Sequence, residues 1–270
     1  MNFCKYDGAG NDFVLIDIRQ NDPELTTEQI AHICHRRFGI GADGLMTLGN
    51  ANPPYDFEMR YYNSDGKIGS MCGNGGRCIA AFAYTLGLGH KSVEAQSTLN
   101  FIGYDGPHSA DILLWEPNEG KGVVRLGMRN VECKDIKRCL DGWFLDTGSP
   151  HYVQRVTDLE HFDVVGEGRR IRHDKIFAEG TNVDFIEDMP DGRLFVRTYE
   201  RGVEDETWAC GTGVTACALV SGNTQITTRG GDFAVSFNHT GTAYEDIKLT
   251  GPVSFNFRGQ ITLQPLTFNL

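Results

Sequence analysis

The sequence contains Met71-Cys72-Gly73-Asn74-Gly75 and, about half the chain later, Ala209-Cys210-Gly211-Thr212-Gly213. In each stretch a cysteine directly precedes a Gly-x-Gly turn that opens an apolar segment. The pattern predicts a cysteine at a helix N-terminus, where free backbone N–H groups and the helix dipole stabilise a thiolate. We therefore expect the pKa of each thiol to fall below its ordinary value of about 8.5. Two matched stretches indicate a pair of thiols, one that takes a proton and one that returns it.

The match between the two halves extends upstream of both cysteines. Arg60–Gly66 precedes the first cysteine, and Arg197–Gly202 precedes the second. Further upstream, Gly8–Val14 has a counterpart in Gly148–Val153. A single Cys-Gly-x-Gly more often marks a structural turn, but its duplication at equivalent places favours a catalytic pair. The period is far too long for a solenoid and indicates two similar domains with a ligand site between them.

The segments that follow the cysteines predict the fold class. Cys78–Ala83 and Val214–Val220 are apolar on every face, so each is expected to form a buried helix. Segments of strand length and composition, such as Phe57–Tyr62 and Leu194–Tyr199, surround them. The prediction is an α+β fold with two pseudosymmetric domains. Each domain would be a central apolar helix wrapped by a curved, mainly antiparallel sheet.

A polar, turn-forming stretch at Glu116–Gly120 predicts the boundary between the domains. The N-terminal domain would comprise residues 1–116 and the C-terminal domain residues 117–259, with 260–270 returning to the first domain. One surface helix is expected from Thr26 or Thr27 to about Phe38. Because Thr27-x-x-Ile30 lacks the Glu or Gln of a capping box, its start is left open between the two threonines.

The composition restricts the classes of partner. The formal net charge of −11 argues against nucleic acid or an anionic membrane surface as the main partner. No apolar run approaches membrane-spanning length, and the first residues lack the apolar core of a signal peptide, so we expect a cytoplasmic protein. A chain of 270 residues does not need disulfides, and its eight cysteines include no C-x-x-C pair. Neither a disulfide framework nor a metal site is predicted.

Several polar residues are expected to support the thiols. His151 lies in Gly148-Ser149-Pro150-His151, a turn expected to expose its side chain, and Glu200 ends an apparent strand. Either group could accept a thiol proton. Arg201 offers a fork of donors for a carboxylate. Uncharged amides that could orient an amino acid occur at apparent strand ends or next to glycine, namely Asn11, Asn63, Asn74 and Asn182. Each of these residues taken alone would more often be an ordinary surface side chain.

Together these residues resemble the diaminopimelate epimerase family of cofactor-independent amino-acid epimerases and racemases. The resemblance covers nearly the whole chain. The matching blocks are Gly8-Ala9-Gly10-Asn11-Asp12-Phe13-Val14, Arg36-Arg37-Phe38-Gly39-Ile40-Gly41-Ala42-Asp43-Gly44, Asn63-Ser64-Asp65-Gly66 with Met71-Cys72-Gly73-Asn74-Gly75-Gly76-Arg77-Cys78, Gly148-Ser149-Pro150-His151, Gly180-Thr181-Asn182-Val183, and Tyr199-Glu200-Arg201-Gly202 with Ala209-Cys210-Gly211-Thr212-Gly213. No block alone suffices, but all of them occur in order.

The resemblance implies that a substrate is enclosed between the domains with one thiol on each face of its α-carbon. Cys72 and Cys210 would be the catalytic pair, and His151 and Glu200 would assist their proton exchange. The residues implied to bind substrate are Gly73, Asn74, Gly211 and Thr212 at its reacting carboxylate, and Asn11, Asn63, Ser149, Asn182, Glu200 and Arg201 elsewhere. The implied reaction interconverts LL- and meso-diaminopimelate, in lysine and cell-wall precursor biosynthesis. The resemblance also implies a homodimer that needs no pyridoxal phosphate or metal.

Three positions depart from the family pattern. Ser149 stands where most members have Asn before Pro-His, so one substrate contact would be shorter or water-mediated. Gly44 stands where some members carry a hydrogen-bonding side chain. Val203–Glu206 is one residue longer than the commonest pattern. These departures affect the expected substrate preference and leave the expected catalytic residues in place.

Three alternatives to this function remain at the level of sequence. The first is a proline or hydroxyproline racemase, although a small cyclic substrate would not need Arg201 and several asparagines for a second amino-acid end. The second is a redox protein in which Cys72 and Cys210 cycle through a disulfide. The third is a non-catalytic module that binds amino acids, which would have no need of two activated thiols.

Overall fold

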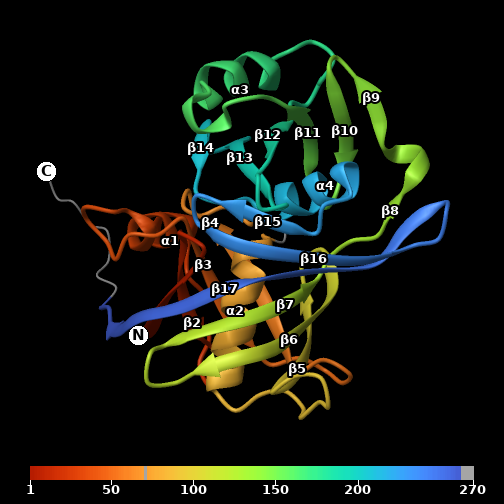
Figure 1. The fold of residues 1–270 in the computed structure, drawn as a ribbon. Helices are drawn as coiled ribbons and strands as arrows, with labels where there is room; N and C mark the ends of the chain where they lie inside the picture. Colours follow the sequence, from red (N-terminus) through yellow and green to blue (C-terminus); the bar gives the residue numbers. More distant parts are fainter. Residues whose placement is uncertain (70–71, 263–270) are drawn as a thin grey trace, which may run out of the picture.

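The computed structural model describes residues 1–69 and 72–262. In these ranges the chain forms one continuous 17-stranded sheet and four α-helices (Figure 1). The elements of the first half are β1 (Asn2–Gly8), β2 (Asn11–Asp17), α1 (Thr27–Cys34), β3 (Gly44–Gly49), β4 (Phe57–Asn63), α2 (Gly73–Thr85), β5 (Ser97–Gly103), β6 (Gly106–Glu116) and β7 (Lys121–Gly127). The short strands β8 (Val131–Glu132) and β9 (Lys137–Cys139) link the halves, with the single 3₁₀ turn Cys133–Asp135 between them.

The second half repeats this series. Its elements are β10 (Gly142–Asp146), β11 (Pro150–Arg155), the 3₁₀ turn Leu159–His161, α3 (Val164–Arg172), β12 (Asn182–Asp188), β13 (Leu194–Glu200), β14 (Asp205–Thr207), α4 (Gly211–Ser221), β15 (Gln225–Thr228), β16 (Gly231–His239) and β17 (Ala243–Gln260).

Strand pairing follows the same order in both halves. From β1 to β7, successive pairs are antiparallel, parallel, antiparallel, parallel, antiparallel and antiparallel. The series β10, β11, β12, β13, β15, β16 and β17 gives the identical sequence of orientations. Helices α1 and α3 occupy the first parallel crossover of each half, and α2 and α4 the second. The predicted α+β fold of two pseudosymmetric domains is confirmed.

A buried helix lies at the centre of each half, as predicted (Figure 1). Every residue of α2 from Gly73 to Ala83 is buried, and so is every residue of α4 from Gly211 to Leu219. Helix α2 packs among side chains that include Phe57 and Phe101. Burial of an aromatic or branched side chain contributes about 1.5–3 kcal/mol, so the wrapped helices form the core of each half.

Strand β17 belongs to both halves. It pairs with β16 up to Thr250, with β7 from Gly251 to Ser254, and with β1 from Ser254 to Gln260. In Figure 1 it runs as one long blue strand that passes beneath α4 and crosses α2. Strand β7 and the end of β17 both pack on the hydrophobic core around α2. The domain boundary at residue 116 therefore stays a prediction. Residues 263–270 of the segment expected to return lie outside the described ranges.

Helix α1 differs from its prediction at both ends. Thr26 is the N-cap, and Gln29 completes a capping box with it, which the reading from Thr27 missed. The helix ends at Cys34, four residues before the expected end, because His35 is extended. The chain then folds back, and a Cβ atom on Gly39 would lie 2.0 Å from the His32 carbonyl oxygen. No helix in the described ranges is long and apolar enough to cross a membrane.

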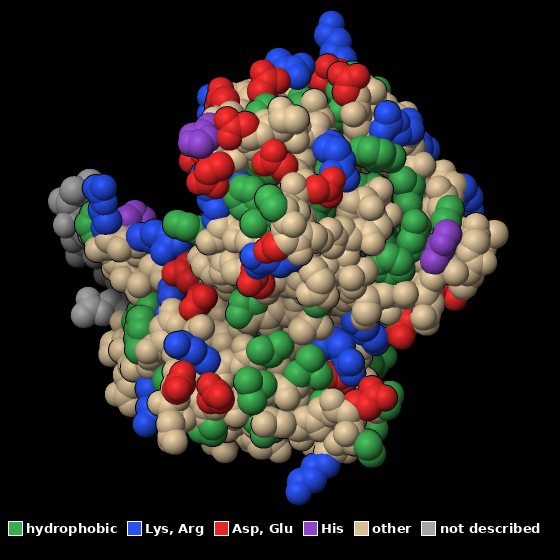
Figure 2. Space-filling model, in the orientation of Figure 1, with side chains coloured by type: hydrophobic (Ala, Val, Ile, Leu, Met, Phe, Trp, Pro, Cys, Tyr) green, Lys and Arg blue, Asp and Glu red, His purple; other side chains and the backbone are tan. Residues whose placement is uncertain are grey.

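Charged side chains of both signs are interspersed over both halves on the face shown in Figure 2. Many form local ion pairs, such as Arg193 with Asp191 and Asp232. Exposed pairs of this kind contribute at most about 1 kcal/mol each. This face is therefore not an extended surface of a single charge.

Candidate active site

The N-termini of the two central helices meet between the halves of the molecule. A Cβ atom added to Gly73 would lie 3.2 Å from the Gly211 Cα, and one added to Gly211 would lie 3.0 Å from the Gly73 Cα. Only glycine at both positions allows this approach without displacement. The Asn74 side chain crosses the same junction and donates to the Ala209 carbonyl at 2.7 Å. The positive ends of two helix dipoles are thereby brought together.

Cys72 and Cys210 are the N-cap residues of these helices, as predicted. The Cys72 thiol is half-buried, and its Sγ donates to Asn11 Oδ1 at 3.5 Å. The Cys210 thiol is buried, and its Sγ lies 3.3 Å from Thr212 Oγ1. Each thiol therefore contacts a polar side chain of its own half of the molecule.

The expectation of lowered thiol pKa values is wrong for this structure. Burial raises the pKa of Cys72 to about 11, although backbone N–H groups at the start of α2 oppose the shift. Burial also raises the pKa of Cys210, and the carboxylates of Glu200 and Asp184 raise it further. Removal of the thiol from water outweighs the helix termini in both cases. Both thiols are protonated in this arrangement, so a base is needed to form a thiolate.

His151 is fully buried, which corrects the expectation that its turn exposes it. It lies on β11, an interior strand between β10 and β12, and α4 packs over it. Its Nδ1 lies 2.6 Å from Asp184 Oδ2. Its Nε2 lies 2.9 Å from Thr212 Oγ1 and 3.0 Å from Ser149 Oγ. The imidazole is therefore held on both sides by polar groups.

Thr212 connects this histidine with the second thiol. Its Oγ1 lies within hydrogen-bond distance of His151 Nε2, Ser149 Oγ and Cys210 Sγ. A continuous row of polar contacts thus runs from Asp184 through His151 and Thr212 to Cys210. Sequence analysis missed Asp184, although an acidic residue inside the apolar stretch Val183–Ile186 is a sign of a buried, partnered carboxylate.

The first half places different groups beside its thiol. Asn11 Nδ2 donates to Asp43 Oδ2 at 2.6 Å, and the other oxygen of Asp43 accepts from Arg36 at 2.6 Å. Arg36 also pairs with Asp12. Burial would raise the pKa of Asp12, but hydrogen bonds from Arg36 and Lys5 hold it at about 2. In the first half the neutral Asn11 amide therefore lies between the Cys72 thiol and a carboxylate. In the second half the His151 imidazole, with Thr212, occupies the equivalent place.

Glu200 ends β13 and lies close enough to both thiols for its charge to raise their pKa values. Burial raises the pKa of Glu200 itself, although the nearby His151 lowers it. Tyr61 of β4, which sequence analysis also missed, lies near Cys72 and Glu200, and burial raises the pKa of its hydroxyl. A carboxyl group with a raised pKa beside two thiols is suited to exchange protons with them.

The remaining predicted residues are placed as follows. Asn182 Oδ1 accepts from the Arg201 backbone N–H at 2.8 Å, and its Nδ2 donates to Ser149 Oγ at 3.2 Å. The Arg201 guanidinium donates to the Glu179 carbonyl at 3.3 Å. Asn63 is exposed at the end of β4. Ser149 and Asn182 therefore join the His151 cluster, whereas nothing described brings Asn63 to a thiol.

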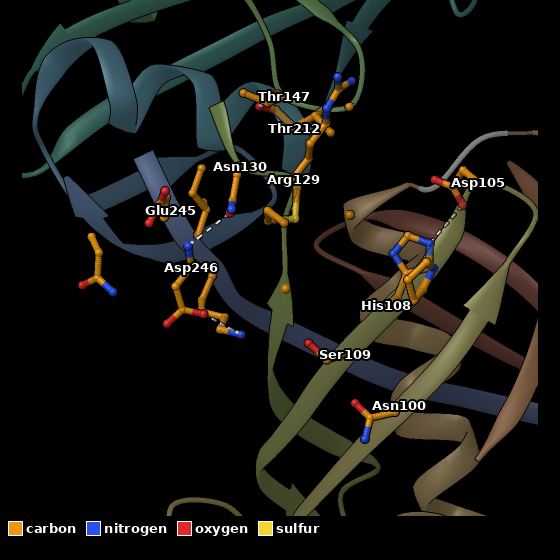
Figure 3. Close-up of a pocket in the computed structure, with 18 of the residues that line it drawn as sticks. Asn100, Asp105, His108, Ser109, Arg129, Asn130, Thr147, Thr212, Glu245 and Asp246 are labelled. Atoms are coloured by element: carbon orange, nitrogen blue, oxygen red, sulfur yellow. Dashed lines mark hydrogen bonds and ion pairs between the residues drawn. The ribbon is translucent and has the colours of Figure 1, made fainter. Parts of the chain in front are cut away.

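A cavity of about 1180 Å³ opens beside the paired helix termini (Figure 3). Gly73, Thr147 and Thr212 line it, together with side chains from both halves such as His108 and Asp246. Figure 3 shows His108 turned toward Asp105 on one wall, and Asp246 paired with Asn130 on the other. Gly73 and Thr212, two of the four residues predicted to bind a substrate carboxylate, thus border a space large enough for a small molecule.

A family model described as diaminopimelate epimerase matches residues 3–98 and 143–255. The chain belongs to the diaminopimelate epimerase family. A family member from Flavobacterium psychrophilum, named diaminopimelate epimerase, is 44% identical over 97% of this chain and 100% of its own length. Another with that name, from Chlorobaculum tepidum, is 40% identical over 95% of this chain and 99% of its own. The chain is thus an epimerase, which leaves the redox and binding-module alternatives without support.

Two solved structures share the fold of the present chain. A structure named as a probable proline racemase from Agrobacterium radiobacter superposes with a TM-score of 0.73, covering 98% of this chain and 94% of its own, at 14% identity. A hydroxyproline epimerase from Agrobacterium vitis gives a TM-score of 0.69 at 15% identity, covering 98% and 93%. Identities this low establish a common fold and do not bear on the substrate.

Proposed function

We propose that this protein interconverts LL- and meso-diaminopimelate without a cofactor, using Cys72 and Cys210 as the two proton-transfer groups. The observation that carries the proposal is the meeting of two helix N-termini, each preceded by a cysteine, at Gly73 and Gly211. A thiol on each side of this junction can address opposite faces of one α-carbon. Close matches to proteins named diaminopimelate epimerase support the choice of substrate.

The helix termini supply the stabilisation that the reaction needs. Removal of an α-proton leaves a carbanion whose charge spreads into the adjacent carboxylate. Backbone N–H groups at the starts of α2 and α4, which meet at Gly73 and Gly211, can hold that carboxylate. Because these donors are fixed and largely shielded from water, they favour the charged intermediate strongly.

The proton transfers require one thiolate and one thiol at the start of each turnover. One cysteine removes the α-proton, and the other delivers a proton to the opposite face, so the two thiols exchange states. Since burial raises the pKa of both, neighbouring bases must create the thiolate. His151 and Glu200 perform this task in the proposal.

The remaining predicted residues would bind the substrate around its α-carbon and at its distal end. We assign Asn11, Asn182 and Ser149 to positions around the α-carbon, since they contact the thiols or His151. Asn63 and the Arg201 side chain would reach the distal amino-acid end. A guanidinium is suited to pair with the distal carboxylate of diaminopimelate, which proline lacks.

Proton NMR of the reduced protein with LL- and meso-diaminopimelate in D₂O tests the proposal. We expect loss of one α-proton signal and interconversion of the isomers without added cofactor. Cys72→Ala and Cys210→Ala should each abolish interconversion, whereas Cys217→Ala, a matched change within α4, should retain it. Full activity of either catalytic variant would exclude the two-thiol mechanism. Exchange with proline or hydroxyproline, and none with diaminopimelate, would favour the racemase alternative.

The place of the enzyme in lysine and cell-wall precursor biosynthesis, in the cytoplasm, follows from the proposed substrate and is proposed with it. The homodimer also stays a proposal, supported by the family resemblance. Light scattering of the purified protein at several concentrations measures its mass against the 29.9 kDa of one chain. A mass that remains that of a single chain would exclude a stable homodimer.

A further inference from the structure

Asp184 is a fully buried carboxylate that the proposed reaction does not yet use. Its Oδ1 accepts a hydrogen bond from Thr198 Oγ1 at 2.7 Å, and its Oδ2 lies 2.6 Å from His151 Nδ1. A Cβ atom on Gly213 would lie 2.3 Å from Asp184 Oδ1. The second glycine of the Cys-Gly-x-Gly motif thus makes room for this pair. The carboxylate lies against the first turn of α4, where its removal from water is unfavourable in free energy. We therefore expect it to have a specific role.

The contacts around His151 allow a single neutral tautomer. The carboxylate of Asp184 can only accept, so Nδ1 carries the hydrogen. The opposite nitrogen, Nε2, faces the hydroxyl groups of Thr212 and Ser149. The Asn182 amide also faces it through Nδ2, whose identity is set because Asn182 Oδ1 accepts from a backbone N–H. In this neutral tautomer Nε2 carries no hydrogen and can accept one from the Thr212 or the Ser149 hydroxyl.

We infer that Asp184 is a positioning residue that makes His151 the base for Cys210, with the Thr212 hydroxyl as the connection between them. This inference rests on the proposed function and deepens it. Thr212 Oγ1 donates its hydrogen to His151 Nε2 and accepts the Cys210 S–H. Both distances, 2.9 Å and 3.3 Å, suit these roles.

The transfer balances without any further reactant. The Cys210 S–H bond breaks, and its proton forms a new O–H bond on Thr212. The original hydroxyl proton of Thr212 moves to His151 Nε2, so the hydroxyl is regenerated. The products are a Cys210 thiolate and an imidazolium whose Nδ1–H remains bonded to the Asp184 carboxylate. The carboxylate stabilises this cation and holds the ring in the orientation that the transfer needs.

The effect is confined to one thiol. Two ionisable groups act on His151 directly, Asp184 of β12 by contact and Glu200 of β13 by its charge, and Cys210, the N-cap of α4, is reached through Thr212. At Cys72 the equivalent partner is the Asn11 amide, which cannot take a proton at neutral pH. Loss of Asp184 should therefore change Cys210 and leave Cys72 almost unchanged.

Alkylation of each cysteine tests this directly and needs no substrate. Iodoacetamide is added to the wild type and to Asp184→Asn at neutral pH, and mass spectrometry follows Cys72 and Cys210 separately. We expect alkylation of Cys210 to slow about tenfold or more relative to that of Cys72. Asp188→Asn, a matched change at an exposed position of β12, should alter neither rate. Because the Asp184 charge by itself raises the pKa of Cys210, a purely through-space role predicts faster alkylation, which would overturn the inference.

Turnover provides the second test. Asp184→Asn should lower kcat for diaminopimelate by about 10²-fold while KM changes less than about twofold. In a His151→Gln background the same substitution should have no further effect, because Asp184 acts through His151. An equal loss in that background, or a raised KM with unchanged kcat, would refute the assignment. Absence of turnover in the wild type would count against the proposed function alone, and alkylation would still decide the role of Asp184.

Discussion

The contact between the two helix N-termini gives a sharp prediction for Gly211→Ala. The new Cβ atom would lie 3.0 Å from the Gly73 Cα and 3.0 Å from Leu249 Cδ2. Carbon atoms in good contact are about 3.5–4.0 Å apart, so the helix ends must separate by about 0.5–1.0 Å. The leucine methyl can rotate away, but the backbone of Gly73 can move only with its helix. Gly73→Ala produces the reciprocal clash, at 3.2 Å from the Gly211 Cα.

The expected effect on activity is larger than the effect on stability. Overpacking costs about 1–3 kcal/mol, and the better helix propensity of alanine returns up to about 1 kcal/mol, so Gly211→Ala should lose about 0–2 kcal/mol of unfolding free energy. A shift of nearly 1 Å between groups that act on one carbon should lower kcat/KM about 10²-fold.

Urea unfolding and the α-proton exchange assay measure the two effects on the same samples. Gly49→Ala is the matched control, because a Cβ atom there meets its nearest neighbour, Ile18 Cδ1, at an ordinary 3.6 Å. We expect the control to change stability by less than about 0.5 kcal/mol and to keep its activity. Full activity in both Gly211→Ala and Gly73→Ala would refute the reasoning that the reaction depends on closely joined helix termini.

Three further predictions concern buried charges. Arg77→Met leaves the carbonyl oxygens of Gly73 and Pro252 without their arginine donor and should lower the free energy of unfolding by about 2–4 kcal/mol, as urea titration will show. Burial raises the pKa of Glu200, so folding disfavours its ionised form. Glu200→Gln should therefore raise stability at pH 7 and lower exchange about 10²-fold, whereas a rise in both would argue against its role as a base. Folding lowers the pKa of Asp12 from 3.8 to about 2, so its ionised form stabilises the fold above pH 4. This stabilisation is lost as the pH falls toward 2. The urea midpoint of unfolding should therefore fall less steeply over that range in Arg36→Met than in the wild type.

Short-range patterns predicted most of the architecture. The duplicated cysteine motif and the all-apolar segments behind it located both central helices and the repeat, because a segment that is apolar on every face must be buried wherever it lies in the fold. The capping box at Thr26 was also present in the sequence as Gln29, three residues later, and a reading begun one residue earlier would have found it. The end of α1 could not be predicted from local sequence, since it depends on how the chain after His35 folds back on Ile33.

The chemistry of the candidate site was less accessible. The sequence identified His151 but placed it in solvent, and it gave the thiol pKa shifts the wrong sign. Both errors have one cause, because burial depends on strands and helices that are distant in the chain. The partners of His151 come from β12 and α4, so the role of Asp184 became visible only when these elements were brought together.

The sequence by itself determined two similar halves, each with a cysteine at the start of an apolar helix, since these features depend on residues within one or two turns of each other. The tertiary structure decided that the two helices meet at Gly73 and Gly211, and that β17 joins the halves. It also decided that one thiol faces the Asn11 amide, while the other faces the Thr212 hydroxyl, which in turn contacts an imidazole held by Asp184. These properties arise from contacts between residues that are far apart in the chain, from 33 positions for His151 and Asp184 to 138 for Gly73 and Gly211, where desolvation and packing outweigh local preference.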